Sequence, residues 1–197
     1  PIDGLLLKGT VLTHRADFYA DFTDEFFNQV NQLGMAPDGF TNKLKMSTDD
    51  IYFYVGSLEY MWEDLIFAAE YAQYTGTFKS SQPTIIPHSV LRQQKFYAQV
   101  SYALTDWSQF AFCYSVINDP DDPYGMKKET ETGQMHYSFF QNDIGLSLRF
   151  DVNDYWIVKL EGHLIDGTML VYELDNRKYP DLERYWSLFA AKTTLTF

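Results

Sequence analysis

The feature that most restricts the fold of this chain is an alternation of apolar and polar residues with a period of two. In "QNDIGLSLRFD" (residues 141–151) the apolar side chains of Ile144, Leu146, Leu148 and Phe150 alternate with polar or small ones. Successive side chains of a β-strand point to opposite faces of the sheet, so this segment predicts a strand with one apolar and one polar face. The chain is expected to be all-β and antiparallel.

The same alternation recurs along the chain in about eight segments, each near the length of a tilted membrane-spanning β-strand. No uninterrupted apolar run approaches the ~20 residues that a membrane helix needs. We therefore expect an antiparallel transmembrane β-barrel whose strands separate lipid from water. The other segments are 4–14, 51–60, 64–74, 95–104, 108–116, 155–164 and 184–197.

The expected connections alternate between short and long. Short turns on one side and long loops on the other are typical of bacterial outer-membrane barrels, in which the periplasmic turns are short. The tight turns are expected at 61–63, 105–106 and 152–153. The long polar segments are 15–49, 76–91, 118–136 and 166–183.

Aromatic residues make up 18% of the chain, and many lie near the ends of the expected strands. Tyr and Trp are enriched where a membrane meets water, because their rings are apolar at one end and polar at the other. One girdle near the short turns is expected from Tyr60, Trp62, Trp107, Tyr155 and Trp156. A second girdle near the long loops is expected from Tyr52, Tyr74, Tyr137 and Tyr185.

The C-terminal strands resemble a known family. The stretch "NDIGLSLRFDVNDYWIVKLEGHLIDGT", followed by "YWSLFAAKTTLTF", resembles the last three strands of Gram-negative porins of the general, phosphate- or carbohydrate-selective kind. Phe197 resembles the terminal residue by which the barrel-assembly machinery recognises outer-membrane proteins. The earlier strands match this family only as generic porin-like alternation.

This resemblance implies one barrel domain over residues 1–197 in the bacterial outer membrane, in contact with its lipid. The implied function is passive diffusion of small hydrophilic solutes or ions through a porin that is not an enzyme and has no cofactor. Such porins have about sixteen strands, so the chain would be a C-terminal half, cut at a periplasmic turn before "IDGLLLKG". Porins of this kind are commonly homotrimers.

Two other interpretations stay open. One is a plugged, OmpA-like barrel that serves as a structural anchor and binds partners through its extracellular loops. The other is a soluble barrel or sandwich with its charged face outside. A soluble barrel needs neither aromatic girdles nor alternating loop lengths, so the sequence favours the membrane interpretation.

The polar faces of the expected strands carry charges of both signs. In a wide pore such groups would filter solutes, whereas in a narrow barrel they would pair across the interior and plug it. The arginine and lysines of the last three strands are expected to form a positive stripe. The lumen-lining candidates are Lys8, Glu59, Glu70, Lys95, Arg149, Lys159, Glu161, His163 and Lys192.

One long loop, residues 15–49, is expected to contain a short helix. Its apolar spacing follows Asp24 and Glu25, and Gly34 is a suitable helix end. In a porin this segment corresponds to a constriction loop folded into the lumen, with an external flap or a subunit contact as equal alternatives. Its candidate constriction residues are Asp17, Asp21, Asp24 and Glu25.

Other chemistry has little support in the sequence. The net charge of −12 disfavours a nucleic-acid partner, and the four histidines are not at metal-ligand spacing. A hydrolase triad of Ser147, His163 and Asp166 has no supporting motif, and His163 is better explained as a lumen residue paired with Glu161 or a neighbouring polar group. The aspartates of "NDPDDPYG" (118–125) suit either calcium or, more commonly, a solvated turn. Cys113 is expected on the polar face among small residues.

Overall fold

The computed structural model describes residues 2–34, 36, 40–49, 51–83, 88–171 and 182–196. These residues form an antiparallel β-sheet, as the alternation predicts. Two short α-helices and one 3-10 helix lie in its connections. No helix among the described residues is long and apolar enough to cross a membrane. The strands are β1 (Leu5–His14), β2 (Asp17–Asp21), β3 (Lys43–Thr48), β4 (Ile51–Trp62), β5 (Leu65–Ser80), β6 (Ser89–Thr105), β7 (Ser108–Asn118), β8 (Phe140–Asn153), β9 (Trp156–Gly167) and β10 (Tyr185–Leu195). The helices are α1 (Asp24–Gln32), α2 (Met126–Thr132) and η1 (His136–Ser138).

Eight of the strands follow one path through the sheet, in the order β1-β4-β5-β6-β7-β8-β9-β10. The two remaining strands lie off this path, where β2 pairs with β3 and β3 also pairs with β5. Within the described part of the chain the path ends at β1 and β10, and these two strands do not pair with each other. The eight expected strands are therefore present, and the described sheet is open.

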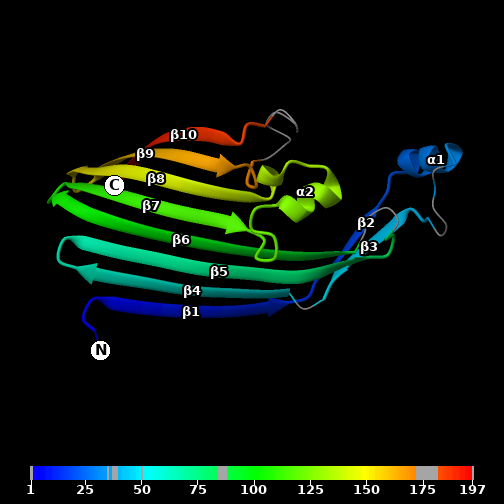
Figure 1. Ribbon diagram of the computed structural model, residues 1–197, viewed down its shortest axis with the longest axis horizontal. Helices are drawn as coiled ribbons and strands as arrows, with labels where there is room; N and C mark the ends of the chain where they lie inside the picture. Colours follow the sequence, from blue (N-terminus) through cyan, green and yellow to red (C-terminus); the bar gives the residue numbers. More distant parts are fainter. Residues whose placement is uncertain are drawn as a thin grey trace. The chain divides into compact units, whose positions relative to one another are not determined.

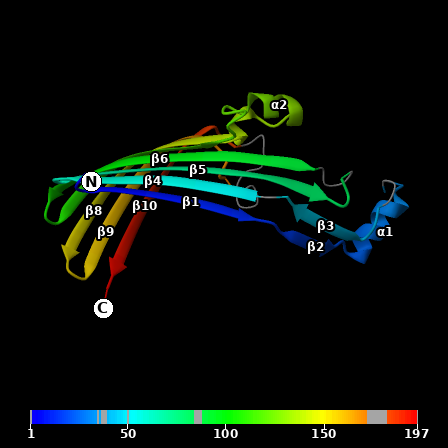
Figure 2. The same cartoon turned by 90° about the horizontal axis from the view of Figure 1, so that it is seen from below.

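The chain divides into two compact units. The first unit comprises residues 1–10, 55–72 and 93–197, and the second comprises 11–54 and 73–92. Within the first unit β6 to β10 lie side by side, with α2 at one end of them (Figure 1). The short turns lie at the other end, where β1 begins and β10 ends (Figures 1 and 2).

The register of the first unit aligns side chains of one kind in rows across neighbouring strands. One apolar row runs from Phe112 through Leu146 and Gly162 to Phe189. The adjacent apolar row runs from Phe110 through Leu148 and Leu160 to Ala191. Because residues in register point to the same side, the alternation of each strand adds up to one continuous apolar face.

This apolar face is not covered by other described residues. Leu146 is 50% exposed, Leu164 66% and Phe189 82%. No large side chain of the described chain is fully buried, and its buried hydrophobic residues are few and scattered. A sheet of this size therefore leaves on its surface the apolar residues that would form the core of a soluble domain. The buried hydrophobic residues are Leu44, Ile51, Ala111, Ile117, Phe140 and Ile165.

The short connections lie one or two residues later than the alternation predicted. They are residues 63–64, 106–107 and 154–155. The register shifts between Ala103 and Thr105 and between Asp151 and Asn153, next to two of these turns. A bulge adds one residue to a strand and interrupts the period of two, so the pattern ends before the strand does.

The predicted loop at 76–91 is shorter than expected, because β5 continues to Ser80 and β6 begins at Ser89. In the segment 118–136 the structure places an isolated bridge from Asp119 to Asp122, followed by α2. Most of the predicted loop at 166–183 lies outside the described residues.

The second unit contains the helix expected in the first long segment. Thr23 caps α1 by accepting a hydrogen bond from the Phe26 N–H at 3.2 Å, and Gly34 follows the helix with a φ of 66°. The rings of Phe22, Phe26, Phe27 and Phe40 pack together, with centroids 5.0 to 5.7 Å apart. The helix prediction is confirmed, but the hairpin of β2 and β3 around it was missed.

Candidate functional site: the polar face of the sheet

The polar face of the first unit carries a row of basic residues on its last three strands. Arg149 on β8 is in register with Lys159 on β9, and Lys159 is in register with Lys192 on β10. The structure thus brings together the three residues from which a positive stripe was expected.

Two of these three basic groups are already paired with acids. Arg149 Nε lies 2.9 Å from Asp151 Oδ1, and Lys159 Nζ lies 2.6 Å from Glu161 Oε1. Each acid is two residues along the same strand and therefore on the same face. Lys192 forms no ion pair with any residue that the structure describes. The row therefore has one unpaired cation at its β10 end.

A second paired group lies further along the same face. His163 Nδ1 is 2.9 Å and 3.1 Å from the two carboxylate oxygens of Asp143 on the neighbouring strand. Gly145 gives this pair its space, since a Cβ at that position would lie 3.0 Å from His163 Cε1 and 2.5 Å from Cys113 Sγ. Cys113 therefore lies beside a glycine on the polar face, where the sequence placed it.

The hydrolase arrangement does not form. The imidazole of His163 pairs with Asp143, whereas Asp166 pairs with Arg184. His163 was expected to pair with Glu161 or a neighbouring polar group, and its partner is the neighbouring Asp143, since the Glu161 carboxylate binds Lys159. Ser147 forms no hydrogen bond with His163 in the described part of the chain, so the nucleophile and base that acyl transfer needs are not joined.

The first strands of the unit carry a different set of charges around a shallow depression. Lys8 on β1, Glu59 on β4, Glu70 on β5 and Tyr97 on β6 line it, together with Ser57. None of these three charged groups forms an ion pair with another described residue. Three neighbouring strands thus contribute charges with no ion-pair partner in the described part of the chain, and β6 adds the Tyr97 hydroxyl.

A chain of hydrogen bonds continues from this depression along β6. The Tyr97 hydroxyl donates to Gln99 Oε1 at 2.8 Å, and Gln99 Nε2 donates to Ser101 Oγ at 2.8 Å. Successive members are two residues apart, so they share the polar face. The remaining candidate on this strand, Lys95, is in register with Ile117 on β7.

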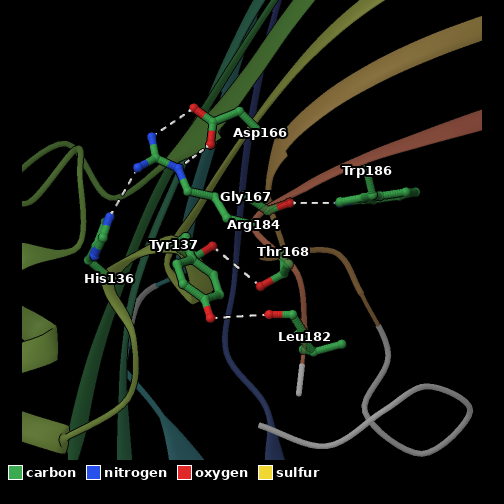
Figure 3. Close-up of polar contacts among 8 residues, drawn as sticks. All are labelled: His136, Tyr137, Asp166, Gly167, Thr168, Leu182, Arg184 and Trp186. Atoms are coloured by element: carbon green, nitrogen blue, oxygen red, sulfur yellow. Dashed lines mark hydrogen bonds and ion pairs between the residues drawn. The ribbon is translucent and has the colours of Figure 1, made fainter. Parts of the chain in front are cut away.

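At the loop end of the sheet an arginine joins β9, β10 and the segment of α2 and η1 (Figure 3). Arg184 binds Asp166 through two hydrogen bonds, Nε to Oδ1 at 2.6 Å and Nη2 to Oδ2 at 3.0 Å. Its guanidinium also lies 5.7 Å from the ring centroid of Phe140, which is 2% exposed, and 4.8 Å from that of Tyr185. Hydrogen bonding to Asp166 raises the pKa of Arg184, which stays charged.

The same cluster ties the loop segments to the strands. His136 Nε2 is 3.5 Å from Arg184 Nη1, and His136 Nδ1 is 3.6 Å from Glu129 on α2. The Tyr137 hydroxyl donates to the Leu182 carbonyl at 3.1 Å, and the Tyr137 carbonyl accepts from Thr168 (Figure 3). Tyr137 was expected in an aromatic girdle, and this cluster was not predicted. Alternation assigns residues to faces and gives no signal for contacts between loops.

The constriction candidates Asp17, Asp21, Asp24 and Glu25 all lie in the second unit, on β2 and α1. Asp17 is already paired, since its carboxylate lies 2.9 Å from Lys45 Nζ. This hydrogen-bonded ion pair raises the pKa of Lys45. The expected assembly signal, Phe197, lies outside the described residues.

The aspartates of "NDPDDPYG" are engaged by the protein itself. Asp119 binds Lys128 Nζ at 2.7 Å, and Asp122 accepts from the Lys128 backbone N–H at 2.9 Å. Asp119 also accepts from the Asp121 N–H at 2.9 Å. No group of three or more His, Cys, Asp or Glu residues in the described part of the chain is arranged to hold a metal ion. The contacts favour the interpretation of a stabilised turn.

The expected girdle near the short turns includes side chains that project into solvent. Trp62, Trp107 and Tyr155 are 55%, 56% and 66% exposed. The indole N–H of Trp156 donates to Thr193 at 2.7 Å on the neighbouring strand. These aromatic side chains lie next to the connections at 63–64, 106–107 and 154–155.

Comparison with known proteins gives no relative, since the chain matches no protein-family model and no curated protein. The function is therefore inferred from the two faces of the sheet.

Proposed function

We propose that this chain forms the wall of an outer-membrane β-barrel porin that lets small hydrophilic solutes or ions diffuse passively. The observation that carries the proposal is the exposed apolar face of the first unit, in register over neighbouring strands, opposite a face that bears charges. Exposing a continuous apolar sheet face of this kind is unfavourable in water, whereas contact with lipid stabilises it.

The loop and turn arrangement supports the same proposal. The short turns lie at one end of the first unit's strands, and α2 lies at the other (Figures 1 and 2). Aromatic side chains beside the short turns suit the membrane interface. The open edges of β1 and β10 would have to pair in lipid, because unpaired backbone groups are costly there.

Paired charges on the polar face favour a pore over a plugged anchor. Arg149 and Lys159 each form an ion pair with an acid on their own strand, and His163 pairs with an acid on the neighbouring strand. Their side chains are also partly exposed, which is compatible with a water-filled lumen.

Conductance in planar lipid bilayers tests this proposal. The full chain is refolded in detergent, and its folded state is verified by a β-rich circular dichroism spectrum and heat-modifiable migration in gels. Stepwise channels are expected. A folded protein that never conducts would instead support the plugged anchor, whereas a monodisperse, folded protein in the absence of detergent would refute the membrane assignment.

Outer-membrane location, contact with the barrel-assembly machinery and assembly into homotrimers form part of the same proposal. Cross-linking of the refolded protein in detergent measures the last of these. A cross-linked ladder that ends at three subunits would support the trimer, and a protein that stays monomeric would contradict it.

A further inference from the structure

The depression on the first strands differs from the rest of the polar face in how its charges are arranged. Lys8, Glu59 and Glu70 line one surface, yet these opposite charges do not pair. On β8 and β9 the basic groups lie 2.9 Å and 2.6 Å from their acids. In the depression, the three charges come from three neighbouring strands, β1, β4 and β5, and no ion pair joins them.

Separated charges of opposite sign select a ligand that carries both. A simple cation would be attracted by Glu59 and Glu70 but repelled by Lys8, and a simple anion would meet the reverse. A solute with an ammonium group at one end and a carboxylate at the other can pair with all three. Charge-assisted hydrogen bonds of this kind are stronger than neutral ones.

The remaining lining suits a small solute. Ser57 and Tyr97 add hydroxyl groups beside the carboxylates, and the rest of the lining is apolar, from Leu6, Leu58, Ala68 and Ala69. The Tyr97 hydroxyl proton is directed to Gln99, so its oxygen remains free to accept from an ammonium group. The site thus offers carboxylate and hydroxyl acceptors on one side and a lysine donor on the other.

We propose that Lys8, Glu59, Glu70 and Tyr97 form a binding site for a small zwitterionic solute of the free amino acid type. Glu59, Glu70 and Tyr97 bind its ammonium group, and Lys8 binds its carboxylate. The site deepens the proposed function by naming a solute class. Binding itself does not require conduction, so the two proposals can fail independently.

Saturation-transfer NMR with glycine tests the site on the full chain refolded in detergent at low salt. Glycine should bind, and methylamine or acetate alone should bind at least tenfold more weakly. Lys8→Gln and the double variant Glu59→Gln/Glu70→Gln should each weaken glycine binding at least tenfold. Because the charges of the solute and of this shallow site would stay exposed to solvent, 0.5 M salt should also weaken glycine binding to the unaltered protein.

A matched control removes one charge of each sign elsewhere. Lys127 and Glu131 form an exposed pair on α2, and Lys127→Gln/Glu131→Gln should leave glycine binding unchanged. Circular dichroism and heat-modifiable migration identify any variant that fails to fold, and the salt titration does not depend on variants. Absence of glycine binding would overturn the site, as would binding that persists in both variants. Methylamine binding that equals glycine binding and strengthens in Lys8→Gln would show a cation site instead.

Discussion

An arginine placed at the centre of the apolar face provides a quantitative test of the membrane assignment. Leu146 is the seventh of the fourteen residues of β8 and is half exposed, in register with Phe112 and Gly162. A strand rises about 3.4 Å per residue, and a tilt of about 40° reduces this to about 2.6 Å along the membrane normal. Leu146 then lies about 16 to 18 Å from either strand end, which places it near the midplane of an apolar band about 25 Å tall.

Leu146→Arg should therefore lower the free energy of unfolding in lipid by about 2 to 4 kcal/mol. This corresponds to a change of roughly thirty- to nine-hundredfold in the equilibrium constant, at 1.36 kcal/mol per factor of ten. The measurement is a guanidinium titration of the protein folded in lipid vesicles, followed by tryptophan fluorescence and heat-modifiable migration.

The neighbouring residue supplies the control. Ser147 points to the polar face, in register with Glu161, so an arginine there stays near water and an acid. Ser147→Arg should change the free energy of unfolding by less than about 0.5 kcal/mol. Equal costs at both positions, or a greater cost at Ser147, would refute the assignment of the two faces.

Two further substitutions test the ends and the interior of the proposed barrel. Arg184→Gln removes the two hydrogen bonds to Asp166 at the loop end and should speed limited proteolysis of residues 119–139 about five- to thirtyfold, the effect of about one or two kcal/mol. Arg184→Lys keeps the charge without the two-pronged guanidinium, so its proteolysis rate should fall between those of the unaltered protein and Arg184→Gln. Unchanged proteolysis in both variants would show that the cluster does not hold the loop. Lys192→Glu should shift the reversal potential in a salt gradient toward cations more than Lys159→Glu, because Lys192 is in register with residue 159 and would offset a carboxylate introduced there. Equal shifts, or none, would show that pairing does not decide which charges act on ions.

The strand segments and their faces could be predicted because the period of two is a direct consequence of strand geometry. Residues 141–151 fall within β8. The register places Leu146 on the apolar face and Ser147 on the polar face, as the alternation predicted. The end of β5 could not be predicted in the same way. Residues 76–80 of "YTGTFKS" lie in the second unit and lack a clear apolar face, although their backbone still forms a strand.

The limits of the sequence are clearest in the charged row of β8, β9 and β10. Alternation places Arg149, Lys159 and Lys192 on one face, and the register aligns them, but neither indicates which cation has a partner. Partners depend on acids two residues away on the same strand, and β10 has Ala190 where β9 has Glu161. The expected stripe of three positive charges is thus reduced to one unpaired lysine beside two neutralised pairs. In the proposed pore, a solute would meet an unpaired positive charge at Lys192, and it would meet the unpaired charges of the depression on β1, β4 and β5 at a second place.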